Sequence, residues 1–563
     1  MAKKYSFSFW FLNLLIAALV ILGVFVVKLL LFKPFDIRHF YERVVYENIW
    51  ESPQALSLSG LPYIAEYSNG DLDDISVQKK IAFLEKVKEN SKILASYDLG
   101  RQVKKDKLNT ELLSFYFRQL REGESFLFYN YPLQPNNGLH VDFPNYMLHC
   151  HKLENRDDIE NYILRLSKFD QKASQLLGHL RKTESVGVVP SLEVIDRILA
   201  SLRNSIGEQK TTLDSMNFSY KRVVPTNVHV LYTNFSKHIN ALPEFERLER
   251  TMYKDQVKNT LEKVVFPAYK SLIAYYVYLK KIATTDTGAW KHPNGDAYFK
   301  YCLEFQSTTE IAPEKIYDDG VLEVAILKDE LAVLIAPDTH VDSIHNTIKL
   351  LELANEKERF YFNSNDNTSQ LVLDAYHSEM AKIHKRLSQV FNLKSAQDKS
   401  IATNFKGPFA SFGIGNQKIS QIPFVSNLIS KANFKNSKAS LKYGIKHLAP
   451  LGQFSHNSIA IDIPNTTKNQ PTFRSMNLFP VFNAGWELYA EQLSWEVGLY
   501  SDASSENLGR LHNRLLHTIL LTLDSGIHFK QWTSQEAIYF LTDNTLISKS
   551  EATLMVEDII VNP

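Results

Sequence analysis

Two short stretches of the chain carry the residues whose types and spacing could do chemistry. One runs from His447 to Gln453 and the other from Ala484 to Glu491. A hydrolytic zinc site needs three protein ligands, an open position for water and a carboxylate that takes the proton of that water. The usual local pattern is a His, a Glu directly after it and a second His one or two helical turns further on. Here Leu448 stands in place of the base, and Gln453 stands where the second imidazole belongs.

Other side chains close to these stretches could replace the missing groups. Glu487 and Glu491 are four residues apart on a predicted helix, so they share one face of it. His456 and His528 could supply imidazoles. We favour a structural interpretation, in which Glu487 is a solvated helix residue and Glu491 and His528 belong to the scaffold. In that case we expect a buried polar network between Arg474 and some of the residues Glu491, Asp524 and His528.

The overall composition is that of a folded protein without an electrostatic preference for nucleic acid. Hydrophobic residues make up 44% of the 563 residues and aromatic residues 12%, which is typical of a chain with a large buried core. The 63 basic and 62 acidic residues nearly cancel, so nucleic acid is not an expected partner. The only cysteines, Cys150 and Cys302, give neither a disulfide framework nor a zinc-ligand pair by their spacing.

The N-terminal segment predicts a membrane anchor. No charged residue occurs from Tyr5 to Val27, and Leu29 to Phe32 extend the apolar run. A helix of this length spans roughly 34 Å, which is enough to cross a bilayer. We therefore expect a single-pass helix over residues 1–35 that contacts lipid through residues 5–32, with a cleaved signal as the alternative. The body of the protein is expected on the periplasmic or extracytoplasmic side.

Beyond the anchor, the hydrophobic pattern predicts a mainly α-helical protein in two halves. Residues 36–285 form the N-terminal helical half, and residues 286–563 form the C-terminal half with the site, since the pattern breaks at 284–293. A small β and loop region is expected at 396–445. Two capping boxes, Thr533-x-x-Glu536 and Ser548-x-x-Glu551, predict the starts of two final helices. The other predicted helical segments cover residues 158–180, 191–206, 242–282 (with a kink at Pro267), 296–305, from 313 onward, and 508–523.

Several runs, in this order, resemble a known family, the bacterial domain of unknown function 885 family. The runs begin at Tyr129-Asn-Tyr-Pro-Leu and include Pro293-Asn-Gly-Asp-Ala-Tyr298, Gly485-Trp-Glu-Leu-Tyr-Ala-Glu491 and Asp524-Ser-Gly-Ile-His528. The resemblance implies a large multi-helix, metallopeptidase-like fold and a zinc motif of the form His-Glu-x-x-Pro-Gly-His-His-x-Gln. When this motif is aligned with the chain, His447 matches its first His. Leu448 takes the place of its Glu, and Gln453 takes the place of one of its later His residues. At the position before Gly-Trp, where the family has a Glu, this chain has Ala484.

Three functions remain open at this point. The first is a catalytically inactive, membrane-anchored peptidase-like protein that binds a peptide or protein in the inherited cleft, with no cofactor. The second is an active hydrolase whose zinc site is rebuilt from His447, His456 and Glu487. The third is a structural subunit of a membrane assembly. We favour the first, because losing a general base alone usually costs about 10²–10⁴-fold in rate.

Overall fold

The computed structural model describes residues 14–17, 20, 23, 28, 32–58, 69–211, 219–335, 470–475, 478–498, 505–545 and 547–563. Its contacts divide the chain into two compact units. The first consists of residues 1–124 and 470–478, and the second of residues 125–469 and 479–563. The break in pattern at 284–293, where the sequence suggested a boundary between two halves, lies inside the second unit. Within the described residues, no helix is both long and apolar enough to cross a bilayer.

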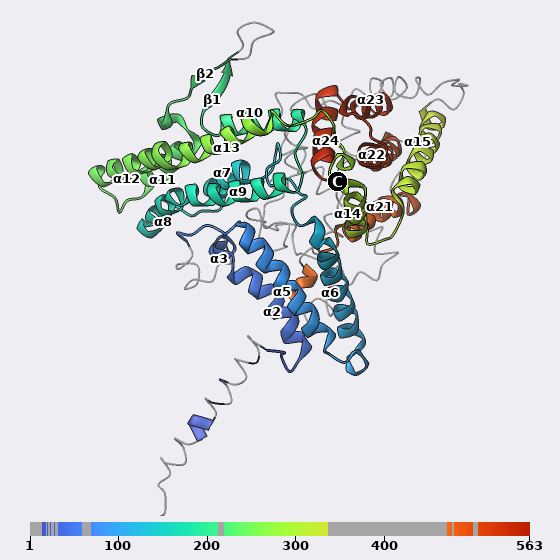
Figure 1. Ribbon diagram of the computed structural model, residues 1–563, viewed down its shortest axis with the longest axis horizontal. Helices are drawn as coiled ribbons and strands as arrows, with labels where there is room; N and C mark the ends of the chain where they lie inside the picture. Colours follow the sequence, from blue (N-terminus) through green and yellow to red (C-terminus); the bar gives the residue numbers. More distant parts are fainter. Residues whose placement is uncertain are drawn as a thin grey trace, which may run out of the picture. The chain divides into compact units, whose positions relative to one another are not determined.

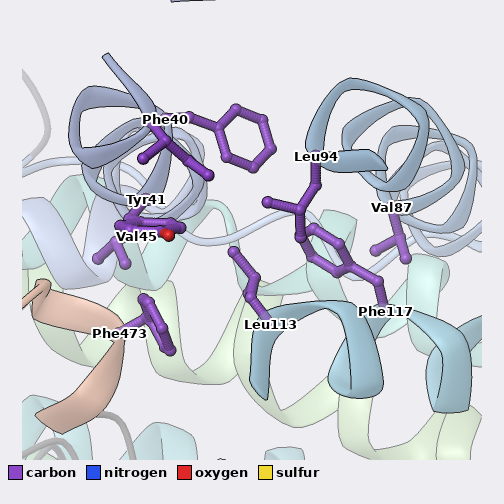
Figure 2. Close-up of a cluster of buried hydrophobic side chains, with 9 residues drawn as sticks. Phe40, Tyr41, Val45, Val87, Leu94, Leu113, Phe117 and Phe473 are labelled. Atoms are coloured by element: carbon purple, nitrogen blue, oxygen red, sulfur yellow. The ribbon is translucent and has the colours of Figure 1, made fainter. Parts of the chain in front are cut away.

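The first unit is a small helical bundle whose core is completed by a distant segment. Phe473 packs against Tyr41 of the first helix, with ring centres 5.6 Å apart (Figure 2), and Thr472 donates to the Glu42 carboxylate from its backbone N–H (3.0 Å) and its hydroxyl (2.6 Å). The buried side chains are Ile37, Phe40, Tyr41, Val45, Val87, Leu94, Leu113, Phe117 and Phe473. The elements are α2 (Ile37–Trp50), α3 (Pro53–Leu58), α5 (Val77–Ala95), η1 (Leu99–Arg101), α6 (Lys104–Glu122) and η8 (Thr472–Ser475).

Helices also dominate the first part of the second unit (Figure 1). Helix α13 packs against both α9 and α10. A two-stranded antiparallel ladder, β1 with β2, interrupts the helices. The elements are η2 (Gly123–Phe126), α7 (Leu139–His149), α8 (Arg156–Ser167), α9 (Phe169–Ser185), α10 (Leu192–Asn204), β1 (Glu208–Thr211), β2 (Ser219–Val223), η3 (Thr226–Val228), α11 (Val230–Ala241), α12 (Arg247–Thr260), η4 (Leu261–Val265) and α13 (Phe266–Leu279).

The second part of this unit carries three of the runs that resemble the family, those beginning at Pro293, Gly485 and Asp524. Helices α15 and α22 form its most extensive helix pair. Gly320 of α15 permits their close approach, since a Cβ there would lie 2.4 Å from the Thr522 hydroxyl of α22. The elements are η5 (Ala289–Lys291), α14 (Gly295–Ser307), α15 (Pro313–Ile335), α21 (Pro480–Glu496), α22 (Ser505–His528), α23 (Ser534–Asn544) and α24 (Lys549–Val561).

Most local predictions are confirmed within the described residues. The chain is mainly helical, and both capping boxes form, with Thr533 and Ser548 each accepting from the N–H three residues on. The predicted irregularity at Pro267 is a π-helical turn over Leu261–Val265, directly before the proline. Proline has no N–H for the helical ladder, and a wider turn accommodates that loss.

Two local features of the structure were not predicted. The segment 158–180 is two helices rather than one, because α8 ends and α9 begins at Lys168 without any Pro or Gly to mark the break. The β1–β2 ladder falls in the half predicted as mostly helical, where its polar sequence gives no alternating signal. The predicted β and loop region at 396–445 lies outside the described residues.

Candidate functional site

The structure describes only part of the predicted site. His447, Leu448, Gln453 and His456 lie outside the described residues. Ala484 is exposed in α21. Glu487 and Glu491 belong to the same helix, but their side chains also lie outside what is described. His528 ends α22 and is fully described.

Helix α21 brings Ala484 onto the face that lines a groove. Pro480 opens the helix, as its fixed φ and missing N–H favour the first turn. Ala484, Leu488 and Gln492 follow at four-residue intervals, so they share one face. Leu488 and Gln492 line the groove. The position where the resemblance expects a carboxylate is therefore an exposed methyl group one turn before the groove.

The groove lies between α21 and α22 and has a volume of about 590 Å³. Its α22 side is a single stripe at spacings of three and four residues, which places all of these side chains on one helix face. The lining residues are Leu488, Gln492, Arg510, Arg514, His517, Thr518 and Leu521. The described lining residues include two guanidinium groups and no carboxylate.

Neighbouring side chains hold both arginines in place. The Arg510 Nη1 donates across the groove to Gln492 Oε1 (3.3 Å), and its guanidinium lies 5.1 Å from the centre of the Trp495 ring. Arg514 forms an ion pair with Glu323 of α15. A fixed guanidinium loses little entropy when it binds a carboxylate through its planar fork. The groove is thus suited to an anionic group on a ligand.

His528 has a structural role that uses both of its ring nitrogens. The backbone N–H of Ala289 donates to Nδ1 (3.0 Å), so the proton is on Nε2, which donates to the carbonyl of Ile559 (2.9 Å). The ring is 1% exposed, and burial lowers its pKa to about 4. No lone pair remains for a metal, and the neutral ring ties α22 to η5 and α24. This agrees with the structural interpretation of His528 rather than with its use as a substitute ligand.

Asp524 lies one turn before His528, with Oδ1 3.8 Å from Nε2. Burial raises the pKa of this carboxyl to about 7. No hydrogen bond joins the two groups, since Nε2 already donates to Ile559. Arg474, which was expected in a network with them, belongs to the first unit and is exposed. The side chain of Glu491 lies outside the described residues.

A second polar cluster in this unit joins two of the family-like runs. The Tyr129 hydroxyl donates to the carbonyl of Pro293 (2.8 Å), and the Tyr298 hydroxyl donates to Asn130 Oδ1 (2.6 Å). Tyr131 is hydrogen-bonded to His292 Nε2 (2.8 Å), and burial lowers the pKa of His292 to about 3. Sequence reasoning missed these pairings, because runs about 160 residues apart carry no local signal of their contact.

Within the described residues, the predicted site supplies no free zinc ligand. Ala484 offers no donor atom, and both nitrogens of His528 are already hydrogen-bonded. In the described ranges, no three His, Cys, Asp or Glu side chains lie together as a metal site would require. Both cysteines are free thiols, and burial raises the pKa of Cys150 to about 11 and that of Cys302 to about 12.

Comparison with solved structures shows the same fold elsewhere. The crystal structure of a "putative lipoprotein" from Colwellia psychrerythraea matches with a TM-score of 0.74 and 19% identity, over 93% of this chain and 88% of that chain. The structure of a "putative lipoprotein of unknown function" from Shewanella oneidensis matches with a TM-score of 0.64 and 13% identity, over 93% and 89%. At these identities the likeness concerns the fold alone.

Comparison with sequences gives the family. No curated protein matches the chain. The profile of a family described as "Bacterial protein of unknown function (DUF885)" matches residues 53–403 and 458–563, which is most of the chain. The chain therefore belongs to the DUF885 family of bacterial proteins.

Proposed function

We propose that this protein is a membrane-anchored, catalytically inactive member of its family that binds a peptide or protein segment in the groove between α21 and α22. One observation carries the proposal. Ala484 shares a helix face with the groove residues Leu488 and Gln492, so a methyl group stands where the resemblance expects a carboxylate. In the sequence, Leu448 and Gln453 stand where the resembling motif has its base and a ligand, so the motif lacks groups that activate water.

The chemistry of the groove favours a ligand with a carboxylate. Arg510 and Arg514 both line it, and the described lining residues bring no negative charge. Leu488 and Leu521 form the apolar part of the groove, which can pack against an apolar side chain of the ligand next to that carboxylate. A peptide with a free C-terminus provides both features.

A location at the bacterial membrane has two independent supports. The uncharged run from Tyr5 to Val27 is long enough to span a bilayer. The proteins from Colwellia psychrerythraea and Shewanella oneidensis, which share the fold, are both described as lipoproteins. We place the body of this protein on the extracytoplasmic side.

Binding is tested with the full chain purified in detergent. Fluorescein-labelled peptide libraries with free C-termini and with amidated C-termini are compared by fluorescence polarisation. Peptides with free carboxylates are expected to bind more tightly. Arg514→Gln should weaken that binding roughly 10–100-fold, since a hydrogen bond to a charged partner contributes about 1.5–3 kcal/mol. Arg118→Gln, at an exposed arginine on α6, is the matched control and should leave affinity unchanged.

Catalysis is tested on the same preparation. The proposal predicts no cleavage of the bound peptides by mass spectrometry and no stoichiometric zinc by elemental analysis. Stoichiometric zinc, with peptide turnover that disappears in His447→Ala, would overturn it in favour of a rebuilt hydrolase.

A further inference from the structure

Three segments of the first unit meet at one end of its bundle. The N-terminus of α2, the C-terminus of α5 and the N-terminus of α6 lie together there. The Lys33 ammonium donates to the carbonyl of Ser96 (2.8 Å), and the Tyr97 hydroxyl donates to the carbonyl of Pro34 (2.7 Å). The Tyr41 hydroxyl donates to the carbonyl of Asp106 (2.9 Å). We call this region, residues 32–38 and 96–107, the loop end of the first unit.

Large apolar side chains are exposed at the loop end. Phe32 is 59% exposed, Phe35 68%, Leu99 46% and Val103 66%. Single exposed apolar residues are ordinary on a protein surface, but a group of them marks an interaction site. Two of these residues belong to the segment before α2, and two to the connection between α5 and α6. The exposed group is therefore built by the fold and not by one stretch of sequence.

The same segments are rich in basic residues. Lys28 and the loop end contain seven basic residues and three acidic ones, whereas the whole chain has 63 basic and 62 acidic residues. The basic residues are Lys28, Lys33, Arg38, Arg101, Lys104, Lys105 and Lys107, and the acidic ones are Asp36, Asp98 and Asp106. The side chain of Arg101 is 90% exposed and that of Arg38 68%. An excess of positive charge is thus concentrated at this end of a nearly neutral protein.

We propose that the loop end docks on the surface of a bilayer that contains anionic phospholipid. Exposed aromatic and aliphatic side chains enter the boundary between head groups and acyl chains, while lysines and arginines attract the anionic head groups. The apolar run of the sequence ends at Phe32, inside the loop end. An anchor formed by that run would hold these side chains at the level of the head groups. This docking goes beyond the anchor, because it fixes the first unit against the membrane, and it is independent of peptide binding.

Depth measurements on the full chain in lipid nanodiscs test the proposal. Val103→Cys is labelled with a polarity-sensitive fluorophore. Glu122→Cys, at the exposed far end of α6 and roughly 27 Å away along the helix, is the control. The native thiols are largely protonated near neutral pH, because burial raises the pKa of Cys150 to about 11 and that of Cys302 to about 12. Labelling is thereby directed to the introduced cysteine.

In nanodiscs of phosphatidylcholine with phosphatidylglycerol, the label at 103 should shift to shorter wavelength and be quenched by a nitroxide lipid. The label at 122 should not respond. Neutralising three basic residues, in Arg101→Gln with Lys104→Gln and Lys105→Gln, should lower the docked-to-undocked ratio roughly 100-fold, since each cationic group contributes about fivefold. Equal water accessibility of the two labels would overturn the proposal, as would shielding at 103 that does not depend on phosphatidylglycerol. Peptide binding in the groove would be unaffected by either result.

Discussion

At the scale of single residues, the structure separates groups that position the scaffold from groups that could meet a ligand. Histidine is a common metal ligand, but both ring nitrogens of His528 are hydrogen-bonded to backbone groups of η5 and α24. Arg510 and Arg514 were not singled out from the sequence, yet they line the groove. Residue type alone did not distinguish the two roles, because the difference depends on which atoms are already hydrogen-bonded.

Asp524 and His528 should have opposite effects on the pH dependence of stability. The pKa of Asp524 is raised from its usual 3.8 to about 7, so the folded state keeps a proton that the unfolded state releases between these values. The pKa of His528 is lowered from 6.5 to about 4, so in that range the unfolded state takes up a proton that the folded state does not. As pH falls from 6.5 to 4, the first group adds stability while the second removes it, and the two largely cancel.

In the variant Asp524→Asn, the pH dependence of stability that comes from His528 should no longer be cancelled. The variant is expected to be more stable than the wild type above pH 7, where it no longer buries a carboxylate charge. Between pH 8 and pH 5, its free energy of unfolding relative to that of the wild type should fall by about 3 kcal/mol. Urea unfolding at a series of pH values measures this difference. A difference that stays constant from pH 8 to pH 5 would contradict the shifted pKa of Asp524.

At the scale of elements, short sequence patterns set where helices begin, and close packing sets how they meet. Thr533 and Ser548 start α23 and α24 as their capping boxes predict. The approach of α15 to α22 instead depends on the missing side chain of Gly320 opposite Thr522. No pattern within either helix shows this contact, because its two residues are about 200 positions apart.

Gly320→Ala and Gly178→Ala form a matched pair that tests this packing. Alanine in a helix is favoured over glycine by about 1 kcal/mol. Gly178 in α9 has open space around it, so its replacement should raise the free energy of unfolding by about that amount. Gly320→Ala should lower it by about 1–3 kcal/mol, since its new methyl group meets the Thr522 hydroxyl. Urea unfolding of both variants measures the effects, and a stabilising Gly320→Ala would show that the two helices are further apart.

At the scale of the whole molecule, the chain builds its first unit from two pieces that are far apart in sequence. Residues 470–478 return to a unit otherwise formed by residues 1–124. Phe473 is 3% exposed in the core of that unit, and Thr472 is bonded to Glu42. The first unit therefore cannot complete its core until most of the chain has been made.

Phe473→Ala should loosen the first unit selectively. Removing a buried phenylalanine side chain costs about 3–5 kcal/mol. Hydrogen exchange followed by mass spectrometry should become faster in α2, α5 and α6 while staying unchanged in α9, α10 and α13. Phe482→Ala, at a side chain that is 55% exposed on α21, is the control and should change neither set. Equal acceleration in both sets would mean that the two units unfold together.

The sequence by itself determined the helical class, the family and the starts of the final helices. These properties depend on residue types at short spacings, which any window of the chain displays. Only the tertiary structure decided that Ala484 lies on the groove face, that His528 is fully hydrogen-bonded, and that the runs at Tyr129 and Pro293 touch. Each of these follows from contacts between distant segments, and the energy of such contacts depends on three-dimensional packing that no local pattern records.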